Sequence, residues 1–239
     1  MPLRLALIAI VAFCLFVVAR NVPETQATSV VDRAVEFATL PCVGIQSTSS
    51  GYVIADETVL TVAHALYETR DFAVLDAAGI WREGEVIRLD LERDLAIVSV
   101  AGLRSTPVDR APARAVSAWP DTSVHMIEGA ASGSVDASIV RRVNVRTQVV
   151  GDRSRDSARK GYEVALDIGP GDSGAAIVDD DGQLVGVVFA RSTQREAVAW
   201  ATAIDEVETT AASVPAWECD DDVEVELDLR RREPERLAG

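Results

Sequence analysis

A serine with glycines on both sides is the residue of this sequence best suited to covalent chemistry. It stands in Gly171-Asp172-Ser173-Gly174, preceded by Pro170 and followed by an apolar run. A serine hydroxyl is a poor nucleophile until a base removes its proton. Flanking glycines let the backbone turn sharply, so that the N–H groups of Gly171 and Ser173 can point at a developing oxyanion. Taken alone, the motif is equally compatible with an ordinary β-turn.

Two histidines are the candidates for the base, because the chain contains no others. His64 ends an apolar run, Leu60–Ala63, that is typical of a strand. His125 lies in the middle of the segment SVHMIE, with no acidic or nucleophilic motif beside it. A histidine in that setting is typical of a structural or exposed position. We therefore predict that His64 takes the proton of Ser173.

An aspartate at the start of an apolar strand can complete the set. Asp94 stands in the segment RDLAIV, where its carboxylate could accept the second N–H of an imidazole. Such a carboxylate fixes the tautomer of the base and stabilises the imidazolium that forms during the reaction. Other acids lack this setting, and we interpret them as turn or surface residues: Asp71, Asp76 and Asp90.

The elements that must position these residues are short strands. From Cys42 onward, β-branched runs recur between Gly, Asp and Ser turns at a spacing of roughly 8–12 residues, which predicts an all-β sandwich or barrel. The run Asp179–Gly182 between two such segments indicates a hairpin. The segment Gly151–Gly161 is polar and mixed in charge, so we predict an exposed loop there.

The order His64, Asp94, Ser173 and the segments TVAHAL, RDLAIV and GDSGA resemble the chymotrypsin-like, or trypsin-fold, serine proteases. The segment GQLVGVVFA and the short spacing between motifs are similar to the compact bacterial branch, which includes HtrA-type and membrane-tethered actinobacterial proteases. The resemblance covers about residues 42–207. It implies two six-stranded antiparallel β-barrels with the active site in the crevice between them.

The same resemblance implies a serine endopeptidase that works through an acyl-enzyme and needs no metal or organic cofactor. His64, Asp94 and Ser173 would be catalytic, and the N–H groups of Gly171 and Ser173 would form the oxyanion hole. Two alternatives stay open. One is a non-catalytic trypsin-like fold that serves as an envelope binding or scaffold protein, and the other is an esterase that uses the same triad.

Two departures from the family pattern bear on this reading. Ala175 and Ala176 follow the serine motif, where the family often has a second glycine and a proline. The activation sequence Ile-Val-Gly-Gly is missing, so Asp172 is not expected to pair with a newly cleaved N-terminus. We therefore expect an enzyme without zymogen cleavage of that kind.

By resemblance, the substrate pocket would have Asp167 at its base and Phe189, Ala190 and Arg191 on the opposite wall. A carboxylate at Asp167 would favour Arg or Lys before the scissile bond through charge pairing. Arg191 could neutralise Asp167 or could itself favour acidic substrates, and either side chain could be a solvated loop residue. We take cleavage after basic residues as the expectation, which makes the arginine-rich segment Gly151–Gly161 a candidate self-cleavage site.

The N-terminus is read as a targeting segment. Leu5–Ala19 is an uninterrupted apolar run between two arginines, long for a signal peptide and short for a membrane anchor, so residues 1–20 are either one. We predict a linker over 21–41, the protease domain over 42–217 and an acidic, charged tail over 218–239.

Cysteine usage and charge fit an exported protein. Cys42 and Cys219 lie near the ends of the exported part, and we predict that they form a disulfide, with two unpaired thiols as the alternative. The net charge of −15 excludes a nucleic-acid partner, and no Cys/His cluster indicates a metal site. The expected partners are protein or peptide substrates, and the membrane if the N-terminal segment is retained.

Overall fold

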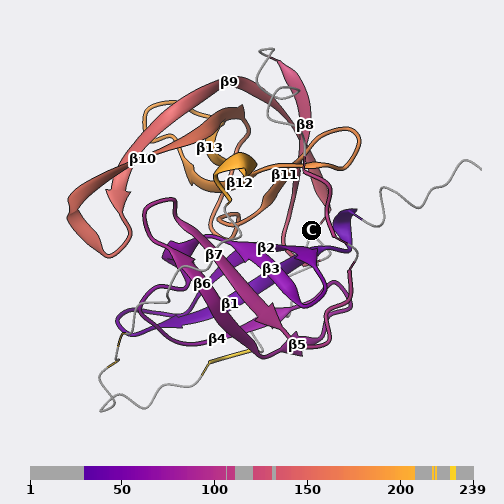
Figure 1. The fold of residues 1–239 in the computed structure, drawn as a ribbon, viewed down its shortest axis with the longest axis vertical. Coiled ribbons are helices and arrows are strands. Elements are labelled where there is room, and N and C mark those ends of the chain that lie inside the picture. The colour runs from indigo at the N-terminus through magenta and orange to yellow at the C-terminus, as the bar shows by residue number, and fades with distance from the viewer. Residues whose placement is uncertain are drawn as a thin grey trace, which may run out of the picture.

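Two antiparallel β-sheets make up almost all of the computed structural model (Figure 1). It describes residues 30–105, 107–110, 121–130, 133–207, 217, 219 and 227–229. The apolar run Leu5–Ala19 and most of the predicted tail lie outside these residues. Within the described part of the chain, no helix is long and apolar enough to cross a membrane.

The first sheet has seven strands in the order β5-β4-β1-β2-β3-β7-β6. Their bounds are β1 (Ala34–Pro41), β2 (Ser47–Ala55), β3 (Thr58–Thr61), β4 (Thr69–Leu75), β5 (Trp81–Arg82), β6 (Gly84–Asp90) and β7 (Leu95–Val100). The sheet curls so that β4 and β6, which lie near opposite ends of the strand order, approach each other. A Cβ at Gly84 of β6 would lie only 2.9 Å from Cε2 of Phe72 on β4. Its core consists of apolar side chains from facing strands, among them Val35, Phe37, Val59, Val74 and Val98.

The second sheet closes into a six-stranded barrel in the order β10-β13-β12-β11-β8-β9. Its strands are β8 (Thr122–Ile127), β9 (Ser134–Val149), β10 (Asp152–Ala165), β11 (Ala176–Val178), β12 (Leu184–Arg191) and β13 (Val198–Ala203). Inward-facing residues of these strands fill the barrel, including Met126, Ile139, Tyr162, Val164 and Ile177. The two units confirm the predicted all-β double-barrel fold, with the short β5 as an additional strand in the first.

The predicted linker over 21–41 is wrong from Ala34 onward. Residues 34–41 form β1, which pairs with both β2 and β4 and is buried along most of its length. This strand is covered on both faces, so its apolar residues do not alternate and the sequence gives no alternating strand pattern there.

The predicted loop over Gly151–Gly161 is also wrong. Apart from its first residue, this segment belongs to β10, which forms a long hairpin with β9 (Figure 1). The hairpin extends to the first sheet, where the Val150 N–H donates to the Leu91 carbonyl oxygen at 3.1 Å. Gly151 lies so close to the Tyr67 ring that a Cβ there would collide with it. A strand paired in this way is a poor substrate, so the self-cleavage expectation loses its basis.

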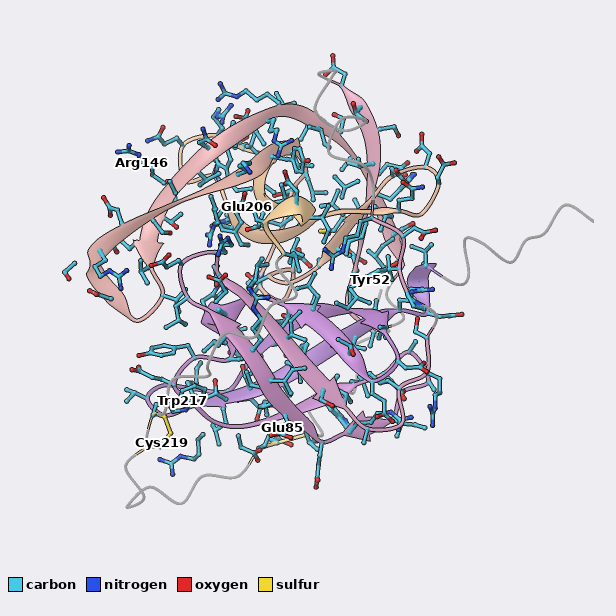
Figure 2. The ribbon with its side chains drawn as sticks, viewed as in Figure 1. Tyr52, Glu85, Arg146, Glu206, Trp217 and Cys219 are labelled. Carbon is cyan, nitrogen blue, oxygen red and sulfur yellow. A yellow bond between two sulfur atoms is a disulfide. The ribbon has the colours of Figure 1, made fainter. Side chains whose placement is uncertain are left out.

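The described part of the tail packs on the first sheet. Cys42, just after β1, forms a disulfide with Cys219 in the structure, and Trp217 and Cys219 lie beside each other there (Figure 2). The Trp217 indole N–H donates to the Thr69 carbonyl oxygen at 3.0 Å, and its ring contacts the ring of Tyr67.

Candidate active site

His64 and Asp94 form a hydrogen-bonded pair on the first sheet. His64 lies in the single-turn helix η1 (Ala63–Ala65), directly after β3, and Asp94 lies in the turn between β6 and β7. The Asp94 carboxylate accepts the main-chain N–H of His64 at 2.8 Å. Its two oxygens lie 3.0 and 2.8 Å from His64 Nδ1. The ring is therefore held with Nδ1 toward the carboxylate, which leaves Nε2 available for a reacting group.

The surroundings of this pair tune the histidine. Burial acts to lower the pKa of His64, but the hydrogen bond that its ring donates to Asp94 and the negative charge of Asp94 outweigh it, so the pKa of His64 lies above its ordinary value. The charge of Arg159 acts in the same direction as burial. Asp94 itself is 4% exposed, has a positive φ of 56° and occupies the left-handed region.

Ser173 lies in the loop between β10 and β11, and both β-units hold this loop. The Ser173 carbonyl oxygen accepts the Ser50 N–H from β2 at 2.7 Å, while the Gly174 N–H donates to Val188 of β12 at 2.8 Å. The Ser50 hydroxyl donates to the Gly171 carbonyl oxygen at 2.8 Å. Gly174 has a φ of 91°, and a Cβ there would overlap the Ser50 carbonyl, so only glycine fits.

Two main-chain donors in this loop are unused. Neither the Gly171 N–H nor the Ser173 N–H has a hydrogen-bond partner among the described residues, and Gly171 has a φ of 103°. The Asp172 carboxylate accepts the Gly169 N–H at 2.7 Å, which closes the loop on itself. Two free N–H groups beside a serine hydroxyl are the donors that an oxyanion requires.

One cleft of about 620 Å³ brings His64 and Ser173 together. Its walls come from both β-units and include Thr48, His64, Tyr67, Gly171 and Ser173. No hydrogen bond between the Ser173 hydroxyl and the His64 ring is present in the described structure, and such contacts are often loose before substrate binds. The arrangement places a serine hydroxyl, an imidazole held by a carboxylate, and two unused main-chain N–H groups at one site.

Residues 49–187, more than half of the chain, match the family model of the trypsin-like peptidase domain. The chain belongs to the trypsin-like peptidase family. It is a serine endopeptidase, as the sequence motifs predicted, and its substrates are proteins or peptides.

Solved structures share the fold of this trypsin-like peptidase at low sequence identity. The active form of the Rv3671c protease from M. tuberculosis is 22% identical, with a TM-score of 0.66, and the match covers 77% of this chain and 83% of that one. The HtrA-type protease AlgW is 19% identical at a TM-score of 0.58, covering 75% and 58%. The serine endoprotease from Yersinia pestis is 17% identical at 0.55, covering 76% and 64%. No curated protein matches this sequence.

The residues predicted to form the substrate pocket of this peptidase are more scattered. Asp167 and Arg191 are exposed, and Ala190 is half-buried. Phe189 is buried, and the guanidinium of Arg159 stacks over its ring at 4.0 Å. None of these four predicted residues is among the described residues that line the cleft of His64 and Ser173.

Sequence reasoning missed Arg159, which the structure places beside Asp94. Arg159 belongs to β10, its side chain is 3% exposed, and its Nη2 lies 3.6 Å from Asp94 Oδ2. Its segment was read as an exposed loop because the residues around it are polar and show no apolar alternation. The pairing of β10 with β9 and the approach of Arg159 to Asp94 of the first sheet are tertiary features. No local sequence signal could therefore have identified Arg159.

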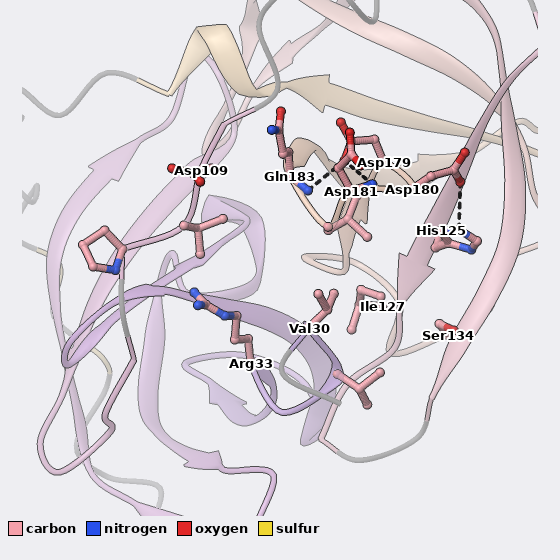
Figure 3. Close-up of a pocket in the computed structure, with 15 residues that line it drawn as sticks. Val30, Arg33, Asp109, His125, Ile127, Ser134, Asp179, Asp180, Asp181 and Gln183 are labelled. Carbon is pink, nitrogen blue, oxygen red and sulfur yellow. Dashed lines mark hydrogen bonds and ion pairs between the residues drawn. The ribbon is translucent and has the colours of Figure 1, made fainter. Parts of the chain in front are cut away.

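The second histidine of the peptidase, His125, lines a different cavity, of about 740 Å³ (Figure 3). His64, Asp94 and Ser173 are not among the described residues that line it. The ring nitrogens of His125 lie 3.0 Å from Asp136 Oδ1 and 3.1 Å from Asp180 Oδ1. His125 thus connects β8, β9 and the turn between β11 and β12. It has the structural surroundings that the sequence indicated.

Proposed function

We propose that His64, Asp94 and Ser173 form the catalytic triad of this peptidase. The observation that carries the proposal is the His64–Asp94 pair: its imidazole lines one cleft together with Ser173, whose loop offers two N–H donors without a partner among the described residues. In the first step, Ser173 Oγ attacks the scissile carbonyl carbon while His64 Nε2 takes the hydroxyl proton. Asp94 holds the Nδ1–H of the ring and stabilises the imidazolium.

The oxyanion of the tetrahedral intermediate is held by the N–H groups of Gly171 and Ser173. When the intermediate collapses, the C–N bond breaks and His64 donates its proton to the leaving amine. Water then attacks the acyl-enzyme while His64 takes one of its protons. The second collapse releases the carboxylic acid, and the proton returns to Ser173 Oγ. His64 carries every proton that moves in this scheme.

The experiment that tests this mechanism is labelling of the full-length chain with a fluorophosphonate probe. The parent protein is expected to label, and Ser173→Ala is expected not to. Ser47→Ala is the matched control, because Ser47 also lines the cleft but its hydroxyl bonds to Thr39 at 3.0 Å, and labelling should persist. Labelling that survives Ser173→Ala, or is missing from the parent, would contradict the triad.

The place of action that fits the chain best is outside the cytoplasm. A disulfide between Cys42 and Cys219 is stable in an oxidising compartment, and the apolar run Leu5–Ala19 has the composition of an export segment. We expect protein isolated from its host to be found in the envelope or outside the cell and to gain the mass of two hydrogens on reduction. Two free thiols in that material would count against export and the disulfide.

The specificity that we propose is cleavage after Arg or Lys. An exposed carboxylate at Asp167 and a net charge of −15 both favour basic substrates. A peptide-library profile is expected to show this preference, and Asp167→Ala should reduce it. The matched control is Asp181→Ala, which removes an exposed carboxylate on the wall of the other cavity. An unchanged profile in Asp167→Ala would remove Asp167 from the pocket.

A further inference from the structure

Arg159 is a buried cation that reaches the proposed triad from the opposite β-unit. It projects from β10 of the second barrel and lies between the ring of Phe189, 4.0 Å from its guanidinium, and the carboxylate of Asp94, 3.6 Å away. Its Nε is buried and has no hydrogen-bond partner among the described residues. Burying a charge and a donor in this way costs free energy, which the interaction of the guanidinium with Asp94 and Phe189 has to offset.

The hairpin that carries Arg159 is hydrogen-bonded to the turn that carries Asp94. The Ser157 hydroxyl donates to the Glu92 carbonyl oxygen at 2.6 Å, and Arg155 lies 2.7 Å from the Glu92 carboxylate. At the hairpin end, Val150 donates to the Leu91 carbonyl oxygen at 3.1 Å. Because Asp94 has a positive φ of 56°, its turn is one that external contacts must hold in place.

Neighbouring charges are already engaged with one another. Asp90 of β6 lies 3.0 Å from Arg93 and 3.7 Å from Arg88. Glu206, in the short helix η2 (Ile204–Glu206), lies 3.5 Å from Arg93 and 3.1 Å from Lys160. Asp94 is the carboxylate within ion-pair distance of Arg159 among the described residues.

We propose that Arg159 is a positioning residue of the triad: it orients the Asp94 carboxylate from the second barrel, and its charge favours the neutral, base form of His64. This inference rests on the proposed function of the triad. Asp94 then interacts with two cations when His64 is protonated, so its negative charge is shared. The benefit is a base that stays unprotonated at lower pH than a His–Asp pair alone would allow.

The electrostatics around His64 agree with this role. Burial and the positive charge of Arg159 lower the pKa of His64, while the hydrogen bond and charge of Asp94 raise it. Removing the cation therefore raises the pKa of His64 further, because a nearby like charge no longer opposes protonation. Burial also lowers the pKa of Arg159, but a guanidinium keeps its charge at any working pH.

The test is an NMR titration of the two histidines of the full-length chain, with Ser173→Ala present to prevent self-digestion. Arg159→Gln and Arg159→Met are expected to raise the pKa of His64 by about one unit and to leave His125 unchanged. Arg159→Lys keeps the charge and should rescue most of the shift. The matched control is Arg153→Gln, which removes the same charge from an exposed position on the same strand, and it should not change the pKa of His64.

The titration needs no peptidase activity, so it is decided separately from the proposed mechanism. With Ser173 restored, the acid limb of kcat/KM in the neutral variants should move up by the same amount, which lowers activity below that limb roughly tenfold. An unchanged pKa of His64 in both neutral variants, or an equal rise in Arg153→Gln, would overturn the proposal. If the neutral variants do not fold, because they strand the buried Asp94 charge, the titration is repeated with Asp94→Asn in the background. The rise of His64 is expected there too, and its failure to occur would equally overturn the proposal.

Discussion

The main-chain N–H of Ser50 on β2 donates to the carbonyl oxygen of Ser173 at 2.7 Å. This bond joins the first sheet to the nucleophile loop of the second barrel. The Ser50 side chain adds a second link, because its hydroxyl donates to the Gly171 carbonyl oxygen at 2.8 Å. Ser50 of the first sheet thus holds the carbonyl oxygens of Gly171 and Ser173, the two residues whose N–H groups are the proposed oxyanion donors.

Ser50→Ala should therefore weaken catalysis more than stability. It removes the bond to Gly171 but keeps the main-chain bond to Ser173, so the loop stays attached while its peptide orientation loosens. A hydrogen bond is worth about 0.5–1.5 kcal/mol, which corresponds to a loss of kcat/KM of roughly two- to twelvefold. Ser49→Ala is the matched control, because the buried Ser49 hydroxyl has no hydrogen-bond partner in the part of the chain that the structure describes. Equal loss in both variants would show that the Gly171 contact is unimportant.

The pair of His64 and Asp94 predicts a distinct pH response. Asp94→Asn should lower kcat about 10⁴-fold, because the imidazole then takes the wrong tautomer. Without the carboxylate, burial and Arg159 lower the pKa of His64, so the acid limb of the remaining activity should move to lower pH. Asp136→Asn, at the exposed partner of His125, should leave kcat and the acid limb unchanged. A limb that stays in place after Asp94→Asn would refute the assignment of His64.

The same pair links stability to pH. The pKa of His64 is raised above its ordinary 6.5 in the folded state, so the pair stabilises the fold below that value. The contribution is lost as the pH rises through the folded pKa. Thermal melts of the parent and of Asp94→Asn should accordingly differ most at acidic pH, and a difference that grows with rising pH would contradict the shift.

Gly174 allows a test of the backbone at the nucleophile. Gly174→Ala combines a positive φ of 91° with a Cβ that would overlap the Ser50 carbonyl, so it should destabilise the fold by about 2–5 kcal/mol and abolish probe labelling. Gly169→Ala in the same loop is the control, because nothing lies within 4 Å of its Cβ position and its φ is not positive. Chemical denaturation measures both, and comparable stability of the two variants would rule out the close approach.

The sequence predicted those features that depend on residue type and local order. Ser173, His64 and Asp94 stand out because of the residues beside each of them, and the recurring turn residues predicted a fold of short strands. Arg159 could not be found in this way, because its burial depends on the Asp94 turn and Phe189, both distant in the chain. The strand β1 was missed for a related reason: a strand paired on both sides and covered on both faces loses the alternation that identifies strands.

Glu163 of β10 supplies the last prediction, on acid stability. Its side chain is 2% exposed, and its carboxylate is paired with Arg195 and with Arg141, whose Nη2 lies 2.8 Å away. The hydrogen bond from Arg195 is the largest cause of a pKa below the ordinary value, and Arg141 adds to it against the effect of burial. A lowered folded pKa means that Glu163 stabilises the fold above its unfolded pKa of 4.5 and that this contribution disappears as the pH falls through the folded pKa.

Glu163→Gln should therefore melt at a lower temperature than the parent at neutral pH, and the two melting temperatures should converge under acid. Glu196→Gln, at an exposed glutamate in the loop before β13, should match the parent at every pH, and a Glu163→Gln deficit that persists at low pH would show that packing, rather than charge, is what Glu163 contributes.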